Sequence, residues 1–231
     1  GMILGEGNIK MSKSKGNVVN PDDYLNKYGA DSTRLYEMFM GPFDQSIAWD
    51  EQGVTGTTKF LNKVWALRIR VVENILVDKK ISNALHQTIK KVGNDIINMR
   101  FNTAVSQMMI MVNLWEKEEK INKEDWQKFI LILSPFAPHM AEEIWSEMGH
   151  KESITNISWP AFDEELIMAD EFELVVQVNG KVRDKLSVEV GIDQKGVEEL
   201  IQKSDKVNKY LDGQEIKKII YIPNKLINIV L

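Results

Sequence analysis

The residues of this chain best suited to chemistry are three lysines in a short polar segment. Lys10, Lys13 and Lys15 alternate with Ser12 and Ser14, and a glycine follows directly. Ammonium groups on flexible stems bind polyanions, serine hydroxyls can hold a phosphate or the loop itself, and glycine lets the backbone move. The glycine spacing of a Walker phosphate loop is absent. The residues alone therefore indicate either a phosphate-binding loop or a solvated run of charge.

Two short helices are expected to position this loop. Asn20 can cap a helix that opens with Pro21 and acidic first-turn residues. A second helix is predicted from about Asp31 until Gly41-Pro42 stops it. Residues 1–50 leave no room before the lysines for a fold that could hold them. This segment is therefore expected to be an appendage, the end of a larger domain.

Residues 51–160 have the apolar period of an amphipathic helical bundle. Apolar residues recur in steps of three or four, and short polar segments separate the stripes, as in antiparallel helices. The predicted stripes run from Phe60 to Ile75, Leu85 to Ile96 and Phe101 to Trp115, then from a cap at Asn122 to Leu133, with a break at Pro135 and Pro138 and a last helix ending near Gly149.

The apolar period changes from helical to alternating near the C-terminus. An acidic stretch at 161–171 is expected to be a solvated connector. Beyond it, Asn179-Gly180 between two alternating runs predicts a β-hairpin, Asp193 can cap a helix, and two further strands return at the end. The fold class is therefore predicted to be mainly α, with a small α+β domain at 172–231 in β-β-α-β-β order.

Composition excludes several classes of function. The net charge of -5 means that nucleic-acid binding must use local basic patches. The chain has no cysteine, and His86, His139 and His150 are far apart, so no metal site is expected. No run of about 18 apolar residues occurs, so no membrane partner is predicted and a cytoplasmic location is expected.

The literal sequence of several segments carries a family resemblance. Lys10-Met11-Ser12-Lys13-Ser14 resembles, letter for letter, the KMSKS signature of class I aminoacyl-tRNA synthetases. Tyr28-Gly29-Ala30-Asp31 and the segment Ser134 to Trp145 look like the leucyl, isoleucyl and valyl branch, the latter like its anticodon-binding-type helical domain. Val176 to Arg183 and Ile220 to Pro223 resemble the bacterial leucyl type. The resemblance covers essentially the whole chain, as the C-terminal part of such an enzyme.

This resemblance implies activation of leucine by ATP and its transfer to tRNA(Leu). It implies that Lys13 contacts ATP, that Lys10 supports the loop or the phosphates, and that Ser12 and Ser14 shape the loop. Leucine and ATP would bind through the catalytic half of the enzyme, Mg²⁺ would accompany ATP, and a monomer is expected. The other family signature, the nucleotide-binding sheet, the leucine pocket and the editing insertion are not found in these residues. The chain is therefore expected to be inactive alone.

The C-terminal domain offers basic residues for RNA. Lys181, Arg183 and Lys185 follow the hairpin turn and are predicted to share one face of a strand, while Lys217, Lys218 and Lys225 lie near the last strands. Residues 171–231 hold ten basic and ten acidic residues, so an ordinary solvated face is an equal interpretation from sequence. The resemblance favours tRNA. The alternatives are a valyl or isoleucyl enzyme and a non-enzymatic tRNA-binding module.

Three further features are interpreted as structural. We expect His139 to be a hydrogen-bonded helix-start residue and Trp49 to be a packing anchor between the appendage and the bundle. Asp31 and Arg34 are expected to be a cap and a helix-surface pair.

Overall fold

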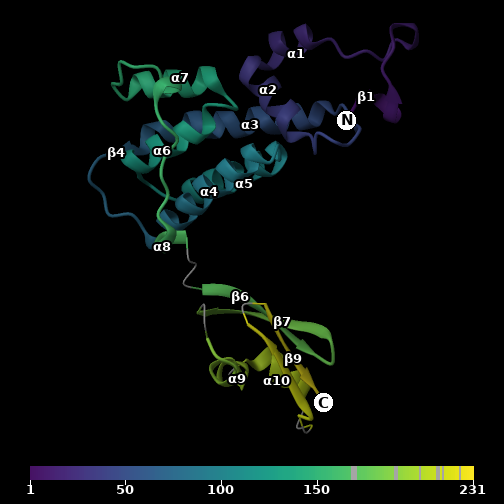
Figure 1. Cartoon of the computed structure of the whole chain (residues 1–231), viewed down its shortest axis with the longest axis vertical. Helices are drawn as coiled ribbons and strands as arrows, with labels where there is room; N and C mark the ends of the chain where they lie inside the picture. Colours follow the sequence, from purple (N-terminus) through teal and green to yellow (C-terminus); the bar gives the residue numbers. More distant parts are fainter. Residues whose placement is uncertain (168–170, 190–191, 203, 212–213, 215, 224) are drawn as a thin grey trace. The chain divides into compact units, whose positions relative to one another are not determined.

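In the computed structural model the chain forms two compact units, residues 1–167 and 168–231 (Figure 1). The structure describes residues 1–167, 171–189, 192–202, 204–211, 214, 216–223 and 225–231. The first unit is helical apart from short strands, and the second is a small α+β domain. The predicted fold class is confirmed.

The N-terminal appendage combines a small sheet with two helices. Its strands β1 (Ile3–Gly5), β2 (Ile9–Lys10) and β3 (Ile47–Ala48) lie in the order β2-β1-β3, with β1 and β3 parallel. The helices are α1 (Pro21–Tyr28) and α2 (Ala30–Phe39). The predicted cap of α1 is confirmed, because the Asn20 side chain accepts the backbone N–H of Asp22 at 3.3 Å. The sheet is a feature that local sequence pattern did not predict, since its partner strands are two or three residues long.

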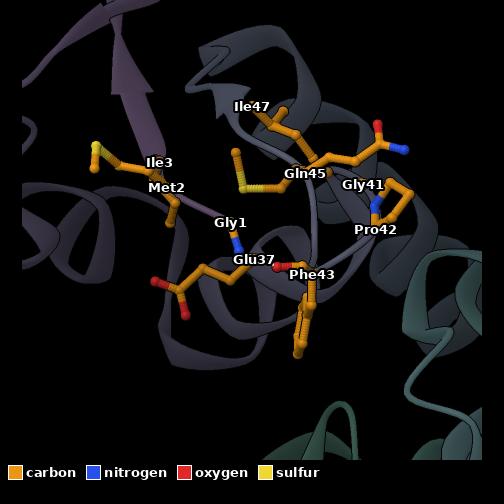
Figure 2. A pocket seen from close by; sticks show the side chains of 10 residues that line it. Gly1, Met2, Ile3, Glu37, Gly41, Pro42, Phe43, Gln45 and Ile47 are labelled. Carbon is orange, nitrogen blue, oxygen red and sulfur yellow. Dashed lines mark hydrogen bonds between the residues drawn. The ribbon is translucent and has the colours of Figure 1, made fainter.

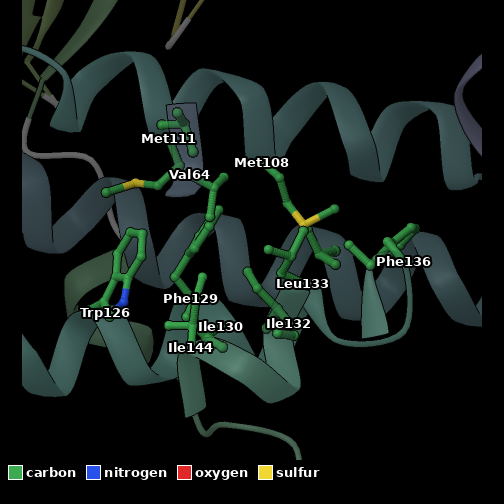
Figure 3. Packing of buried hydrophobic residues seen from close by; sticks show 14 of the residues in the cluster. Val64, Met108, Met111, Trp126, Phe129, Ile130, Ile132, Leu133, Phe136 and Ile144 are labelled. Atoms are coloured by element: carbon green, nitrogen blue, oxygen red, sulfur yellow. The ribbon is translucent and has the colours of Figure 1, made fainter. Parts of the chain in front are cut away.

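The bundle buries one continuous apolar core. Large side chains from successive helices interdigitate there, with Met108 filling space between Leu133 and neighbouring aliphatic groups (Figure 3). Trp115, Trp126 and Phe129 pack as an aromatic group with ring centroids 5.1–5.8 Å apart. The helices are α3 (Glu51–Leu67), α4 (Lys79–Ile97), α5 (Phe101–Trp115), α6 (Lys123–Leu133) and α7 (Pro138–Glu147), with the short strands β4 (Val71–Val72) and β5 (Ile121–Asn122).

The helix predicted from the first apolar stripe, Phe60 to Ile75, is wrong beyond Leu67, where α3 ends. A 3₁₀ turn follows, and Val71 then pairs in parallel with Ile121 instead of continuing the helix. Arg70 donates to the carbonyl oxygens of Glu116 and Glu118 at 3.1 and 3.0 Å, at the end of α5. These long-range bonds override the helical period, which the apolar residues alone would extend to Ile75.

The appendage is joined to the bundle by the packing of Leu35 into the bundle core and by a helix cap supplied from outside the helix. No side chain of the α7 N-terminus caps it. Instead, the Asp31 carboxylate accepts the backbone N–H groups of His139 at 3.3 Å and Met140 at 2.7 Å, and also contacts His139 Nδ1 at 2.8 Å. Asp31 thus acts as a cap and His139 as a helix-start residue, as predicted. The predicted pairing of Arg34 with Asp31 is replaced by a bond from Arg34 to the Pro135 carbonyl at 3.3 Å.

Part of the acidic stretch expected to be a solvated connector lies against α4. It forms the short helix α8 (Glu164–Ile167), and Lys90 pairs with Glu164 at 2.8 Å. The Asp163 backbone N–H donates to His86 Nδ1 at 2.8 Å, and burial, then the nearby Lys128 charge, lowers the pKa of that imidazole. A neutral ring is therefore the acceptor. Residues 168–170 of the stretch lie outside the described residues.

The C-terminal unit is a four-stranded mixed sheet with two helices packed on its apolar side (Figure 1). The strand order is β7-β6-β9-β8, and β6 and β9 are parallel. The predicted hairpin turn is confirmed, because Asn179 and Gly180 have positive φ values of 49° and 75°, as a type I′ turn requires. The elements are β6 (Glu171–Val178), β7 (Lys181–Glu189), α9 (Gln194–Gln202), α10 (Asp205–Leu211), β8 (Lys218–Ile222) and β9 (Leu226–Val230).

Replacing Asp31 with alanine is expected to lower the free energy of unfolding of residues 1–167 by about 1–3 kcal/mol, because two N–H groups of α7 no longer have their acceptor. All six tryptophans lie in this unit, so urea denaturation followed by tryptophan fluorescence reports on it alone. The exposed Asp44 supplies the control, since Asp44→Ala should change stability by less than about 0.5 kcal/mol. Equal stability of the two variants would contradict the role of Asp31.

Candidate functional site

The lysine segment forms a tight turn between β2 and α1. Backbone bonds from Lys15 N to Ser12 O, at 3.1 Å, and from Gly16 N to Lys13 O, at 3.2 Å, close a 3₁₀ turn over Lys13–Lys15. Gly16 ends the turn with a φ of 64°, a value that residues with a Cβ adopt with difficulty. The turn therefore has a defined backbone shape.

The cationic side chains of this turn are presented to solvent. Lys10, Lys13 and Lys15 are exposed and make no ion pair with any residue that the structure describes. Ser12 Oγ and Ser14 Oγ lie 3.3 Å apart, so the hydroxyls face one another across the turn. Three unneutralised ammonium groups around two hydroxyls form a surface that can bind the phosphates of a polyanion.

Asn17 is a residue of the loop that sequence reasoning missed. Its Oδ1 accepts the backbone N–H of Ser12 at 2.9 Å, and its Nδ2 donates to the Lys10 carbonyl at 3.4 Å. The Asn17 amide thus joins the entry of the loop to its middle. A polar amide directly after the flexible Gly16 was the available signal, since asparagine side chains often bond to nearby backbone groups in turns.

Aromatic side chains fix the helices that follow the loop. Trp49 lies edge-on to Tyr24 of α1 and to Tyr36 of α2, with centroids 4.7 and 4.9 Å apart, and its backbone N–H donates to the Leu4 carbonyl of β1 at 2.8 Å. The next residue, Asp50, caps α3 through a bond from Gln52 N at 3.0 Å. Trp49 therefore packs within the appendage immediately before α3, and its predicted role as an anchor for the bundle stays a prediction.

A hollow of about 270 Å³ lies within the appendage (Figure 2). Its walls come from the start of the chain, β3 and the end of α2, and Glu37 is the one ionised side chain among the residues that line it. Backbone and apolar groups make up the rest, including Ile3, Pro42 and Phe43. None of the loop lysines lines this hollow, so it is separate from the lysine turn.

The prediction that the basic residues of β7 share one face is wrong, because the strand contains a β-bulge. The register with β6 shifts between Val176 and Gln177, which leaves Arg183 as the extra residue. The Arg183 guanidinium lies 4.0 Å from the ring centroid of Tyr210, on the helix-covered side. Lys185 lies opposite Val175 and pairs with Glu173 at 2.6 Å, on the other side. A bulge adds one residue to a strand, so alternation no longer keeps the two basic residues on one face.

Strand register divides the remaining basic residues between two ends of the sheet. Lys181 lies opposite Val178, and Lys218 lies opposite Val230, so both stand with Lys217 at the end formed by the hairpin turn. Lys225 lies in the turn between β8 and β9, where its carbonyl accepts Val175 N at 3.3 Å. Lys225 therefore stands at the opposite end of β8 and β9, while Lys185, opposite Val175, lies midway along β7. Lys181, Lys217 and Lys218 are exposed, and no described residue pairs with them as an ion.

Comparison with known families now identifies the larger part of the chain. Residues 78–201 match the anticodon-binding domain of tRNA ligases, which is more than half of the 231 residues. The chain belongs to this family of anticodon-binding domains. Residues 1–50, which carry the lysine turn, match the class I tRNA synthetases of the I, L, M and V group. The resemblance to class I synthetases predicted from sequence is therefore confirmed.

A solved structure resembles this anticodon-binding chain over its whole length. It is the ternary LeuRS–tRNA–LeuAMS complex containing agnB2 LeuRS of Agrobacterium radiobacter K84, with 28% identity and a TM-score of 0.80. The match covers 100% of this chain and 32% of the LeuRS chain, so the present chain spans about a third of that protein. No helix in the described ranges of the anticodon-binding chain is long and apolar enough to cross a membrane.

Proposed function

We propose that this chain is the C-terminal part of a leucine–tRNA ligase, which activates leucine with ATP and transfers it to tRNA(Leu). The observation that carries the proposal is the exposed lysine turn, within residues that match class I synthetases. Similarity to a LeuRS over the full chain supports the leucyl branch. The protein is proposed to act as a monomer in the cytoplasm, and the present residues to be inactive without a catalytic domain.

Lys13 is proposed to stabilise the transition state of leucine activation. The leucine carboxylate forms a bond to the α-phosphorus of ATP while the bond to pyrophosphate breaks, so negative charge grows on the phosphate oxygens. Lys13 lies at the start of the 3₁₀ turn, exposed and without an ion-pair partner among the described residues. An ammonium group that approaches only as this charge develops lowers the barrier more than it strengthens ATP binding.

The neighbouring residues are proposed to support this interaction. Lys10 adds positive charge at the entry of the turn, and Ser12 and Ser14 can each donate a hydroxyl to phosphate or hold the turn through their mutual approach at 3.3 Å. Mg²⁺ is expected to enter with ATP. The described residues include no group of three or more metal-ligating side chains, and no step of this proposal runs through the ion.

The C-terminal unit is proposed to bind the tRNA backbone through Lys181, Lys217 and Lys218. These exposed ammonium groups stand at one end of the sheet, and without a described ion-pair partner they need break no ion pair to reach phosphate. Arg183, stacked on Tyr210, can present its guanidinium to RNA from the helix side. Lys185 and Lys225 are given smaller roles, because Lys225 stands at the other end and Lys185 lies midway along β7 and already pairs with Glu173.

A second candidate is the corresponding part of a valyl or isoleucyl enzyme. The class I match of residues 1–50 covers the I, L, M and V enzymes together and so does not favour leucine by itself. A non-enzymatic tRNA-binding module, in which Lys13 would have no catalytic task, is the other alternative. Amino-acid dependence of pyrophosphate exchange, measured in a full-length enzyme that contains these residues, separates all three.

In such a full-length enzyme, Lys13→Ala is expected to lower kcat for leucine-dependent ATP–pyrophosphate exchange by about 10² to 10³, as removal of other preorganised charged groups does. Lys59→Ala, on α3 outside the turn, is the control of equal charge and should remain active. Exchange that depends on valine or isoleucine instead of leucine would favour the second candidate. Full activity of Lys13→Ala would contradict the catalytic role.

Salt-titrated binding of this chain to leucine tRNA should weaken when Lys181, Lys217 and Lys218 are all replaced by alanine. The slope of log K against log salt is expected to fall by about 0.7–0.9 for each phosphate that the variant no longer binds. The matched control is Lys185→Ala with Lys225→Ala, which alters lysines away from the hairpin-turn end and should bind nearly as well as the unaltered chain. Equally weakened binding in the two variants would contradict the assignment of tRNA binding to the hairpin-turn end of the sheet.

A further inference from the structure

The Asn17 side-chain amide joins the entry of the lysine turn to its middle. We propose that Asn17 is a positioning residue for the turn, and that Asn17 seated against Gly5 forms a latch whose release lets the turn open. The latch itself rests on the bonds and packing within residues 1–17. Its consequence for catalysis rests on the proposed interaction of Lys13 with ATP.

The latch needs both halves of the Asn17 amide. The oxygen accepts Ser12 N–H at 2.9 Å, and the nitrogen donates to the Lys10 carbonyl at 3.4 Å. An amide supplies an acceptor and a donor on one rigid group, whereas an ionised carboxylate supplies acceptors alone. The two bonds tie backbone groups on either side of Met11 to one point. The position of the turn that follows is therefore set by where Asn17 lies.

Gly5 provides the seat for Asn17. A Cβ atom at Gly5 would lie 2.7 Å from the backbone carbonyl oxygen of Asn17, which would have to shift, and 3.1 Å from Asn17 Nδ2, a tight contact. Gly5 is buried and pairs with Ile9 across β1 and β2. A side chain at this position must therefore displace Asn17 from the strand.

The seat is connected to the bundle through the small sheet. Leu4 of β1 pairs with Ala48 of β3, and its carbonyl accepts Trp49 N–H immediately before the cap of α3. While the latch is closed, Lys13 thus has a fixed place relative to α3. Fixed placement of a charged group chiefly affects the transition state, where small displacements are costly.

The latch is also weak enough to open. The latch consists of two hydrogen bonds, of which the one to the Lys10 carbonyl is long, and the turn that follows is exposed to solvent. A partly exposed hydrogen bond changes an opening equilibrium by about threefold, so removal of both bonds should raise the open population about tenfold. Release needs no other bond between the Asn17 side chain and the rest of the described chain to break.

The rate of trypsin cleavage measures this opening, because trypsin cleaves after Lys13 and Lys15 only when the turn opens. When reclosing is faster than cleavage, the cleavage rate follows the open population. For the 231-residue chain, mass spectrometry should find cleavage after Lys13 and Lys15 about tenfold faster in Asn17→Ala, and faster also in Gly5→Ala, which keeps the amide but removes its seat. Asn17→Asp, which keeps the acceptor for Ser12 alone, should also be faster than the unaltered chain.

Asn20→Ala is the matched control, because Asn20 caps α1 and makes no bond to the turn. It should leave cleavage after Lys13 and Lys15 within about twofold of the unaltered chain. A rise in Asn17→Ala that is no larger than in Asn20→Ala, or that occurs equally at lysines throughout the chain, would overturn the latch. Unchanged cleavage in both Asn17→Ala and Gly5→Ala would do the same.

The catalytic consequence has a separate readout in the full-length enzyme. Asn17→Ala should lower kcat of pyrophosphate exchange about tenfold and change the KM for ATP by less than about twofold, since positioning acts in the transition state. Faster trypsin cleavage with unaltered exchange in both Asn17→Ala and Lys13→Ala would reject the proposed function and keep the latch. Normal cleavage together with a lower kcat in Asn17→Ala would reject the latch and keep the proposed function.

Discussion

The attachment of the N-terminal appendage to the bundle depends on the cap that Asp31 of α2 places on α7, beside the packing of Leu35 into the bundle core. The Asp31 side chain is 11% exposed and accepts two backbone N–H groups of a helix that begins more than a hundred residues later. A carboxylate at a helix N-terminus also meets the favourable end of the helix dipole. Because α2 follows the lysine turn through α1, this cap ties the segment that matches class I synthetases to the anticodon-binding bundle.

The lysine turn rests on residues of the same appendage. Trp49 packs between Tyr24 and Tyr36 and bonds to β1, and β1 provides the seat at Gly5 for Asn17. The cationic side chains stand beyond this rigid base, unpaired among the residues described. A rigid base beneath exposed ammonium groups fits the proposal that this turn binds phosphate as charge develops.

The sequence predicted those elements that are determined by residues acting on their immediate neighbours. Asn20 and the Asn179-Gly180 pair act on their immediate neighbours, so the first cap and the hairpin turn could be anticipated. The end of α3 could not, because bonds from Arg70 to the distant end of α5 accompany it. The bulge at Arg183 likewise depends on pairing with β6, and it moved Lys185 to the other side of the sheet. The lysine turn was recognised from its residues, whereas the Asn17 latch depends on how the chain folds back so that Asn17 reaches Ser12, Lys10 and Gly5.

The most direct test of this account is native-state hydrogen exchange of the His139 and Met140 amides in the unaltered chain and in Asp31→Ala. The account predicts that both amides lose protection in the variant, together with the amides of α1 and α2, while those of the C-terminal sheet are unchanged. Protection of His139 and Met140 that survives removal of the carboxylate would contradict the claim that Asp31 joins the loop-bearing segment to the bundle.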